Sequence, residues 1–551
     1  MIEIICTNNN LKKEYPIGTT LQEIAEDMKV TSDYPILAAK VNNEVKSLHY
    51  EIYKNKVVHF IDATDISGYM IYERSLHFLL YKAVKELYPT QNLVIGHSIS
   101  GGKYCEFEDA GFTIDEAVCQ AIEQRMRELV EQDIPFIREE LPTKEALQIF
   151  EKEGLTNKKN LIEKRNYLYT SVYHLGDCIN YFYGCLAPST RYLRKFGLKP
   201  YGSGLLMMMP SRHHPNHLVN PAPSPKLFNI FSEYKTWNKI LGISYVSDIN
   251  RLIDEGNGTA LLMLTEALQE KKIAQVADHI KEKGDVKIVL LSGPSSSGKT
   301  TTSKRVSLQL AVLGYFPVPV SMDNYFVERG HTPLDKDGKP DFEHLNAIDL
   351  DLFNSQMNDL IHGKEIDIPT FDFQQGTKVW KGNKLKLGPK GVLVIEGIHA
   401  LNPALLPGLP QSQTFRIFAS ALTTIAIDRQ NPIHTTDNRL IRRIIRDSKY
   451  RGYSAENTLL RWESVRKGET KWIFPYQENA DEMFNSAICC ELNIFKPFAL
   501  QQLYKVTEAS EAYSEARRLI KMLEYFTELP EKDVPHSSIL REFFGGSVFK
   551  Y

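Results

Sequence analysis

Two patterns of apolar residues divide the chain near its middle. From residue 286 onward, mainly apolar runs of strand length (VKIVLL, FPVPVSMDNY, GVLVIEGIHA and QTFRIFAS) alternate with helical stretches at 300–313, 349–362 and 437–447. Apolar strands that alternate with helices are typical of a parallel sheet with helices on both faces. The second half is therefore predicted to be an α/β domain.

The first half follows a different pattern. Residues 1–62 combine short strand-like runs with one amphipathic helix and a hairpin turn at Asn42-Asn43. Residues 63–240 mix amphipathic helices with strands, and 258–284 favours one or two helices that end at Gly284. We expect an α/β multidomain protein in which this helical stretch connects the two halves.

Composition narrows the class of protein. The 551 residues suggest three or four domains at ~150 residues each. A formal net charge of −2 provides no overall field that would draw the chain to nucleic acid or to an anionic membrane. Seven scattered cysteines without a C-x-x-C pair favour a reducing compartment. No apolar run approaches ~18 residues and the start lacks a signal-peptide pattern, so we expect a cytoplasmic protein without a membrane partner.

The stretch GPSSSGKT matches the phosphate-loop pattern G-x4-G-K-[ST], with an apolar strand before it and a helix after it. Glycines allow backbone N–H groups to turn toward phosphates, and the following helix adds its positive N-terminal end. Lys299 is expected to reach the β- and γ-phosphates of ATP, and Thr300 to hold Mg²⁺. The alternative is a glycine-rich turn without a ligand. The candidate nucleotide-binding residues are Gly293, Pro294, Ser295, Ser296, Ser297, Gly298, Lys299, Thr300 and Thr301.

Two acidic residues stand at the ends of the next apolar runs. Asp323 follows FPVPVSM, and Glu396 ends GVLVIE. Ligands of open α/β sheets bind at the carboxyl ends of the strands. Asp323 can there accept the proton of an attacking hydroxyl, and Glu396 can help to hold the metal ion. The alternative for Asp323 is a helix cap or a turn.

Arginines recur at helical spacing in DNRLIRRIIRD. Arg439, Arg442, Arg443 and Arg446 are three or four residues apart, so they share one side of a helix. Arginines in such an arrangement can hold transferring phosphates like a lid. The alternative is a charged helix face that only contacts water.

With these residues in hand, the second half, from about 285 to 510, resembles the uridine kinase/phosphoribulokinase family of P-loop kinases. The similar segments are SGPSSSGKTT, MDNYF, FEHLNAID, IPTFDF, VIEGI, DNRLIRRIIRD and WIFPYQENADEMFNS. The resemblance implies ATP-dependent phosphorylation of a ribose hydroxyl. It makes Asp323 the base that faces the 5′-hydroxyl, Glu343 a ligand of the ribose hydroxyls, and Arg443 and Arg446 the catalytic lid arginines beside Lys299. Tyr325 and Phe371, from the same segments, are expected on the substrate side.

Three positions depart from the family pattern. Where uridine–cytidine kinases read the pyrimidine with Tyr, His and Arg, this chain has Phe371, Gly376 and Tyr453. A site without these hydrogen-bonding groups no longer discriminates the base that they read. We therefore expect an altered base specificity, with a purine nucleoside as a credible acceptor.

The first half resembles parts of threonyl-tRNA synthetases. Residues 1–62 are similar to the TGS domain, a β-grasp module, and 63–240 to the synthetase's second additional (editing) domain. Four metal-ligand positions of that domain correspond to Phe78, Lys82, Cys185 and Ser189, of which only the cysteine is a ligand. This resemblance implies a degenerate editing-like domain without the metal site. The predicted division continues with a helical connector at 241–284, the kinase domain at 285–510 and a C-terminal helical tail at 511–551.

The sequence is compatible with two functions. The first is an ATP- and Mg²⁺-dependent nucleoside kinase, expected as a homo-oligomer, whose metal ligands are Thr300 and Glu396. The alternative is a translation-linked RNA-binding or regulatory protein that uses the P-loop fold as an ATP switch. In either case the first half is a candidate for binding RNA or a regulatory nucleotide.

Overall fold

A parallel sheet of five strands organises the second half of the chain. The computed structural model describes residues 1–551 except 109–110, 166, 336–337, 408–409 and 551. The strand order is β18-β21-β17-β22-β25, and every neighbouring pair is parallel. All four apolar runs form strands, as predicted, and a fifth strand was not anticipated. The bounds are β17 (Ile288–Ser292), β18 (Phe316–Ser321), β21 (Gly391–Glu396), β22 (Thr414–Ser420) and β25 (Glu482–Asn485).

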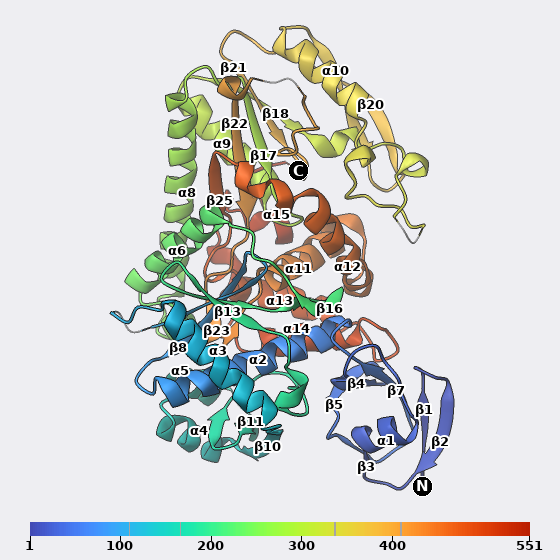
Figure 1. Ribbon diagram of the computed structural model, residues 1–551. Helices are drawn as coiled ribbons and strands as arrows, with labels where there is room; N and C mark the ends of the chain where they lie inside the picture. Colours follow the sequence, from blue (N-terminus) through green and yellow to red (C-terminus); the bar gives the residue numbers. More distant parts are fainter. Residues whose placement is uncertain (109–110, 166, 336–337, 408–409, 551) are drawn as a thin grey trace.

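Helices cover both faces of this sheet, which confirms the predicted fold class. In β17, Ile288 and Leu290 pack on the side of α10 (Leu350–Ile361). Val289 and Leu291 point to the opposite side, toward α8 (Gly258–Glu282) and α9 (Lys299–Val312). Because side chains alternate along a strand, a strand buried on both faces must be apolar at every position. In Figure 1, α8 runs along one side of the sheet and α10 lies on the other side.

The first 61 residues form a separate small sheet at one end of the molecule (Figure 1). Its strand order is β2-β1-β7-β4-β5, and α1 (Leu21–Asp27) packs its apolar side chains into the same core. Asn42 and Asn43 form the predicted hairpin turn with positive φ values of 46° and 61°, a conformation that asparagine tolerates well. The strands are β1 (Ile2–Cys6), β2 (Leu11–Tyr15), β4 (Ala38–Val41), β5 (Glu44–Ser47) and β7 (Lys56–Ile61).

The two larger sheets of the described middle of the chain pack with a long helix, α2 (Ile66–Leu87). A four-stranded sheet has the order β13-β14-β9-β8, and a three-stranded sheet has the order β10-β11-β12. Their bounds, with helix α3, are β8 (Leu93–Ile99), β9 (Gly102–Phe107), α3 (Glu116–Glu131), β10 (Phe136–Pro142), β11 (Tyr169–Leu175), β12 (Cys178–Asn180), β13 (Gly197–Tyr201) and β14 (Gly204–Met208).

One hydrophobic core joins the middle of the chain to its second half. It contains Phe150 from the middle, Ile249 from α7 (Val246–Asp254) in the connector, and Leu440 from the lid helix α11 (Thr435–Arg446). The predicted C-terminal tail also belongs to this core. The tail contains the helices α14 (Tyr513–Leu523) and α15 (Arg541–Phe544). Their apolar side chains are buried in this core. The domain boundaries stay a prediction.

A buried ion pair connects the same two parts. Lys158 of α5 (Thr156–Glu163) donates to the carboxylate of Asp428, and both side chains are at most 2% exposed. Burial lowers the pKa of Lys158, and the charge of Asp428 acts against that shift. Asp428 also accepts hydrogen bonds from the backbone of Gln430 and Asn431. The charge of Lys158 therefore depends on Asp428 to remain ionised away from water.

The variant Asp428→Asn is expected to destabilise the protein by about 3 kcal/mol, because it leaves the Lys158 charge buried without a partner. Urea unfolding measures the change in the free energy of unfolding. The matched control is Asp254→Asn, which removes a partner of the exposed Lys164–Asp254 pair and should cost less than about 1 kcal/mol. Equal effects of the two variants would contradict the assigned role of the buried pair.

Candidate active site

The predicted phosphate loop lies between the end of β17 and the start of α9. Its backbone conformation requires glycine at two positions. A Cβ atom on Gly293 would lie 2.0 Å from the carbonyl oxygen of Ala419, and Gly298 has a φ of +78°. Ser296 also has a positive φ, 59°. Because the loop leads directly into Lys299, the first residue of α9, the N–H groups of that helix's first turn are presented at the loop.

The predicted metal ligands come together at the mouth of the loop. The hydroxyl of Thr300 lies 3.4 Å from the Glu396 carboxylate, which also accepts from the Ser321 hydroxyl at 2.8 Å. Glu396 is only 7% exposed. Burial and the charge of Asp323 raise the pKa of Glu396 to about 7. Hydroxyl and carboxylate oxygens are the ligands that Mg²⁺ prefers, so these residues fit the implied ion.

Asp323 and Glu343 face the same centre. Asp323 lies in a short 3-10 helix, Met322–Tyr325, directly after β18, and both carboxylates act on the pKa of Lys299. Burial lowers the pKa of Lys299, whereas Glu396, Asp323 and Glu343 act to raise it. Burial raises the pKa of Glu343 to about 7, and the positive charge of Arg443 opposes this shift. The structure therefore brings Lys299, Asp323, Glu343 and Glu396 into one cluster.

The four arginines of α11 divide into two pairs. Arg439 and Arg442 are at most 1% exposed. Arg439 donates to the carbonyl oxygen of Ser295 at 3.0 Å and to Glu469, and Arg442 bonds Glu491. These two arginines hold the phosphate loop from behind, which is neither the phosphate lid nor the water-exposed face that the sequence suggests.

Arg443 and Arg446 are half-buried and lie nearer the reacting groups. The guanidinium of Arg443 donates to the Ser295 hydroxyl at 2.7 Å, and Arg446 pairs with Asp447 at 2.8 Å. The neighbouring charge of Arg446, together with burial, lowers the pKa of Arg451 to about 10, whereas Asp323 acts to raise it. Arg451 was not among the predicted site residues, although its place in the segment R-D-S-K-Y-R follows the lid helix directly.

Tyr325 and Phe371, the two aromatic residues predicted to contact substrate, lie in different surroundings. Tyr325 is fully buried, donates to Gln356 at 2.7 Å and packs edge-on against Phe353. It supports the Asp323 turn from the core, and its contact with substrate stays a prediction. In the 3-10 helix Met322–Tyr325, the Tyr325 side chain turns into the core while Asp323 stays partly exposed, which the motif alone does not reveal.

Phe371 belongs to an aromatic cluster of which Phe373 is the exposed ring. Its ring centroid lies 5.6 Å from that of Phe326 and 5.1 Å from that of Phe373. Beside this cluster, a Cβ atom on Gly376 would lie 2.8 Å from Nε of Arg329. The Arg329 side chain, anchored to the carbonyl oxygen of Phe373 at 2.7 Å, thus occupies the space next to the glycine.

Two carboxylates that sequence reasoning missed contact the phosphate loop. Glu469 of α12 (Ala455–Trp472) accepts from the backbone N–H of Ser295 at 2.9 Å. Glu542 of α15 accepts from the backbone N–H and the hydroxyl of Thr301, at 3.1 Å and 2.6 Å. The two acids are 174 and 241 residues away from their partners along the chain. No local motif marks either of them.

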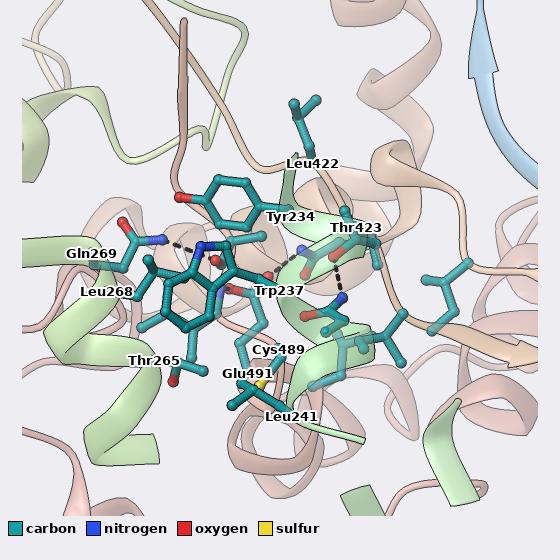
Figure 2. A pocket seen from close by; sticks show the side chains of 18 of the residues that line it. Tyr234, Trp237, Leu241, Thr265, Leu268, Gln269, Leu422, Thr423, Cys489 and Glu491 are labelled. Atoms are coloured by element: carbon teal, nitrogen blue, oxygen red, sulfur yellow. Dashed lines mark hydrogen bonds between the residues drawn. The ribbon is translucent and has the colours of Figure 1, made fainter. Parts of the chain in front are cut away.

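A cavity lies beside this site, between α6 (Pro225–Ile240), α8 and α13 (Glu491–Leu503). Figure 2 shows Tyr234, Trp237 and Gln269 among the side chains that line it. The Gln269 amide donates to the carbonyl oxygens of Asn485 and Ala487 at 2.8 Å and 3.0 Å. Among the described residues that line the cavity, none belongs to the predicted site, so the candidate chemistry stays at the phosphate loop.

The comparisons with known proteins agree with this geometry. The sequence model of the Phosphoribulokinase / Uridine kinase family matches residues 288–492. A uridine kinase of Ligilactobacillus salivarius is 31% identical over 195 residues, which cover 35% of this chain and 82% of the relative. The chain belongs to the phosphoribulokinase/uridine kinase family. This confirms the resemblance of the second half, and the sheet with its phosphate loop is the kinase domain of that family.

The N-terminal region matches a different group of proteins. A threonine–tRNA ligase of Desulforamulus reducens is 32% identical over 200 residues, 36% of this chain and 31% of the ligase. The chain thus spans about a third of the length of the ligases that it matches.

Among solved structures, one described as a possible uridine kinase from Bacillus stearothermophilus is 16% identical, with coverage of 39% of this chain and 100% of that chain and a TM-score of 0.27. Within the described residues, none of the helices of this family member combines the length and the apolar character that crossing a membrane requires.

The raised pKa of Glu396 predicts a pH-dependent stability of the metal-free family member. The folded state keeps its proton up to a pH of about 7, whereas the unfolded state releases it near 4.5. The stabilisation is therefore complete below pH 4.5 and is lost as the pH rises toward 7, by about 3 kcal/mol for this group. Urea unfolding at a series of pH values measures it. The variant Glu396→Gln should flatten this part of the profile, and an unchanged slope would contradict the assignment.

Proposed function

We propose that this protein transfers the γ-phosphate of ATP to the 5′-hydroxyl of a nucleoside. The observation that carries the proposal is the cluster of Asp323 and Glu343 with Lys299 and Arg443 at the mouth of the phosphate loop. A protein that only hydrolyses or senses ATP has no need of two carboxylates on the acceptor side. Family membership supports the kinase chemistry, and the nucleoside acceptor rests on this cluster.

Each residue of the site has its own role in phosphate transfer. The phosphate loop and Lys299 hold the donor phosphates. Mg²⁺, held by Thr300 and Glu396, would supply positive charge to the phosphate oxygens. Asp323 orients the attacking hydroxyl and accepts its proton, and Arg443 and Arg446 balance the charge that develops on the transferred group. Such catalysis consists largely of positioning and electrostatic stabilisation.

Glu343 is suited to hold the ribose. Its carboxylate is close to both Arg443 and Lys299, and two oxygens of one carboxylate can accept from two neighbouring hydroxyls. Its raised pKa shows that the negative form is poorly compensated without a ligand. Two hydrogen-bond donors from a ribose would favour the ionised form. Binding of the nucleoside and ionisation of Glu343 should therefore support each other.

The base contacts support an altered specificity. The aromatic cluster of Phe326, Phe371 and Phe373 offers flat apolar faces, and Arg451 lies over the Phe373 ring at 5.2 Å. Gly376, with Arg329 packed against it, replaces the family's histidine. Stacking surfaces accept any base but favour a large one, and a purine offers more area than a pyrimidine. We infer a purine nucleoside as the acceptor.

The variant Asp323→Asn should lower kcat by about 10²–10⁴-fold, because it removes the general base. Steady-state rates on the preferred nucleoside measure the effect. Asp351→Asn, which changes an exposed carboxylate of α10, is the matched control and should keep the wild-type rate. Full activity of Asp323→Asn would show that another group accepts the proton.

A panel of ribonucleosides and deoxyribonucleosides with ATP tests the acceptor. We expect monophosphate formation to be fastest with a purine ribonucleoside, because the three pyrimidine-reading groups are replaced. A strong preference for uridine or cytidine would contradict the inferred specificity but not the kinase. ATP hydrolysis without any monophosphate, together with co-purifying RNA, would instead support the ATP switch.

A further inference from the structure

The C-terminal helix α15 places a carboxylate on the phosphate loop. Glu542 accepts from two groups of one residue, the N–H and the hydroxyl of Thr301. Thr301 lies in the first turn of α9, directly after the predicted metal ligand Thr300. Backbone N–H groups at this end of a helix are the donors with which phosphate loops bind phosphate oxygens. The Glu542 carboxylate therefore occupies an anion position of the loop.

The rest of the segment is fitted to the same surface. Ile539 packs on Gly298, so that a Cβ atom there would lie 2.5 Å from its Cδ1. The Phe543 ring lies under the Arg442 guanidinium at 5.0 Å. Lys449, in the turn that follows the lid helix, donates to the carbonyl oxygen of Phe544 at 2.6 Å. Three contacts of its neighbours thus hold the segment that carries Glu542, and Glu542 is only 9% exposed.

A nucleotide and Glu542 need the same donors. A phosphate oxygen cannot accept from the Thr301 N–H while the carboxylate does, and two anions at this distance also repel each other. The charge of Glu542 already acts on Lys299 and Lys304. Glu542 stands outside residues 288–492, the part that the family has in common.

We propose that Glu542 is an internal competitor of the donor nucleotide and that it sets the affinity of this protein for ATP. The donor binds only after the carboxylate has left Thr301, and α15 then shifts away from the loop. This proposal rests on the proposed function, because it takes ATP as the ligand of the loop. Glu542 would then set the affinity for the donor nucleotide, and the position of the C-terminal segment would depend on whether a nucleotide is bound.

The expected size of the effect follows from the population of the open form. If Glu542 leaves Thr301 in about one molecule in ten, the apparent Kd for ATP is about tenfold above that of the open form. The variant Glu542→Gln keeps the size and packing of the side chain but removes its charge. The form in which residue 542 is bonded to Thr301 then loses most of its stability relative to the open form, in which that bond is broken. The KM for ATP should fall with Kd, while kcat stays within about twofold.

Titration calorimetry of the full chain with Mg²⁺ and ATP tests the proposal on wild type, Glu542→Gln and the control Glu528→Gln. Glu528 is an exposed carboxylate that precedes α15, so it undergoes the same charge change away from the loop. We expect about tenfold tighter binding for Glu542→Gln alone. Unchanged or weaker binding by a variant that melts like wild type would overturn the proposal.

Hydrogen exchange distinguishes this failure from failure of the proposed function. In wild type, ATP should increase exchange in a peptide that covers 536–546, because the segment is displaced. If ATP binds and these amides stay as protected as before, the competitor role is wrong and the kinase proposal stands. If neither wild type nor Glu542→Gln binds ATP, the proposed function is wrong.

Discussion

A partly buried lysine, Lys299, surrounded by carboxylates is the electrostatic constraint at the centre of this molecule. The charges of Glu396, Asp323, Glu542 and Glu343 all act on Lys299, while Arg446 and Arg443 crowd Arg451 on the other side. Like charges held together away from water cost free energy unless opposite charges lie between them. A phosphate chain with a divalent cation carries both signs. A ligand of this kind compensates the acids and the arginines at the same time.

The same constraint explains why the loop is braced with acids. Glu469 and Glu542 each accept from an N–H group of the phosphate loop or of the helix that follows it, and Arg439 and Arg442 hold Glu469 and Glu491 in turn. Unpaired N–H groups in a buried loop are costly. The protein satisfies two of them with its own carboxylates.

The first half of the chain is part of the structure of the kinase domain. Lys158 and Asp428 form a buried pair across the junction. Glu73 of α2 pairs with Lys103 at 2.8 Å, and Lys103 also lies 3.2 Å from His434, the residue that precedes the lid helix. A ligand of the synthetase-like region would act on groups that contact the base of α11. Coupling between the halves would follow from shared packing and buried charge rather than from a flexible linker.

The sequence by itself determined the sheet, the phosphate loop and the family, because each rests on a local pattern of apolar runs or on a spacing that chemistry requires. It also predicted Thr300 from the spacing of the phosphate loop, and Asp323 and Glu396 because the ends of parallel strands meet at one edge. Helical spacing did not separate Arg439 and Arg442 from Arg443 and Arg446, because it defines a face but not what packs against it. Only the family resemblance singled out the second pair. Nor did the sequence reveal the inward turn of Tyr325 or the placement of Glu469 and Glu542. Those were decided by tertiary structure alone, because contacts between residues 174 and 241 positions apart leave no trace in a local pattern.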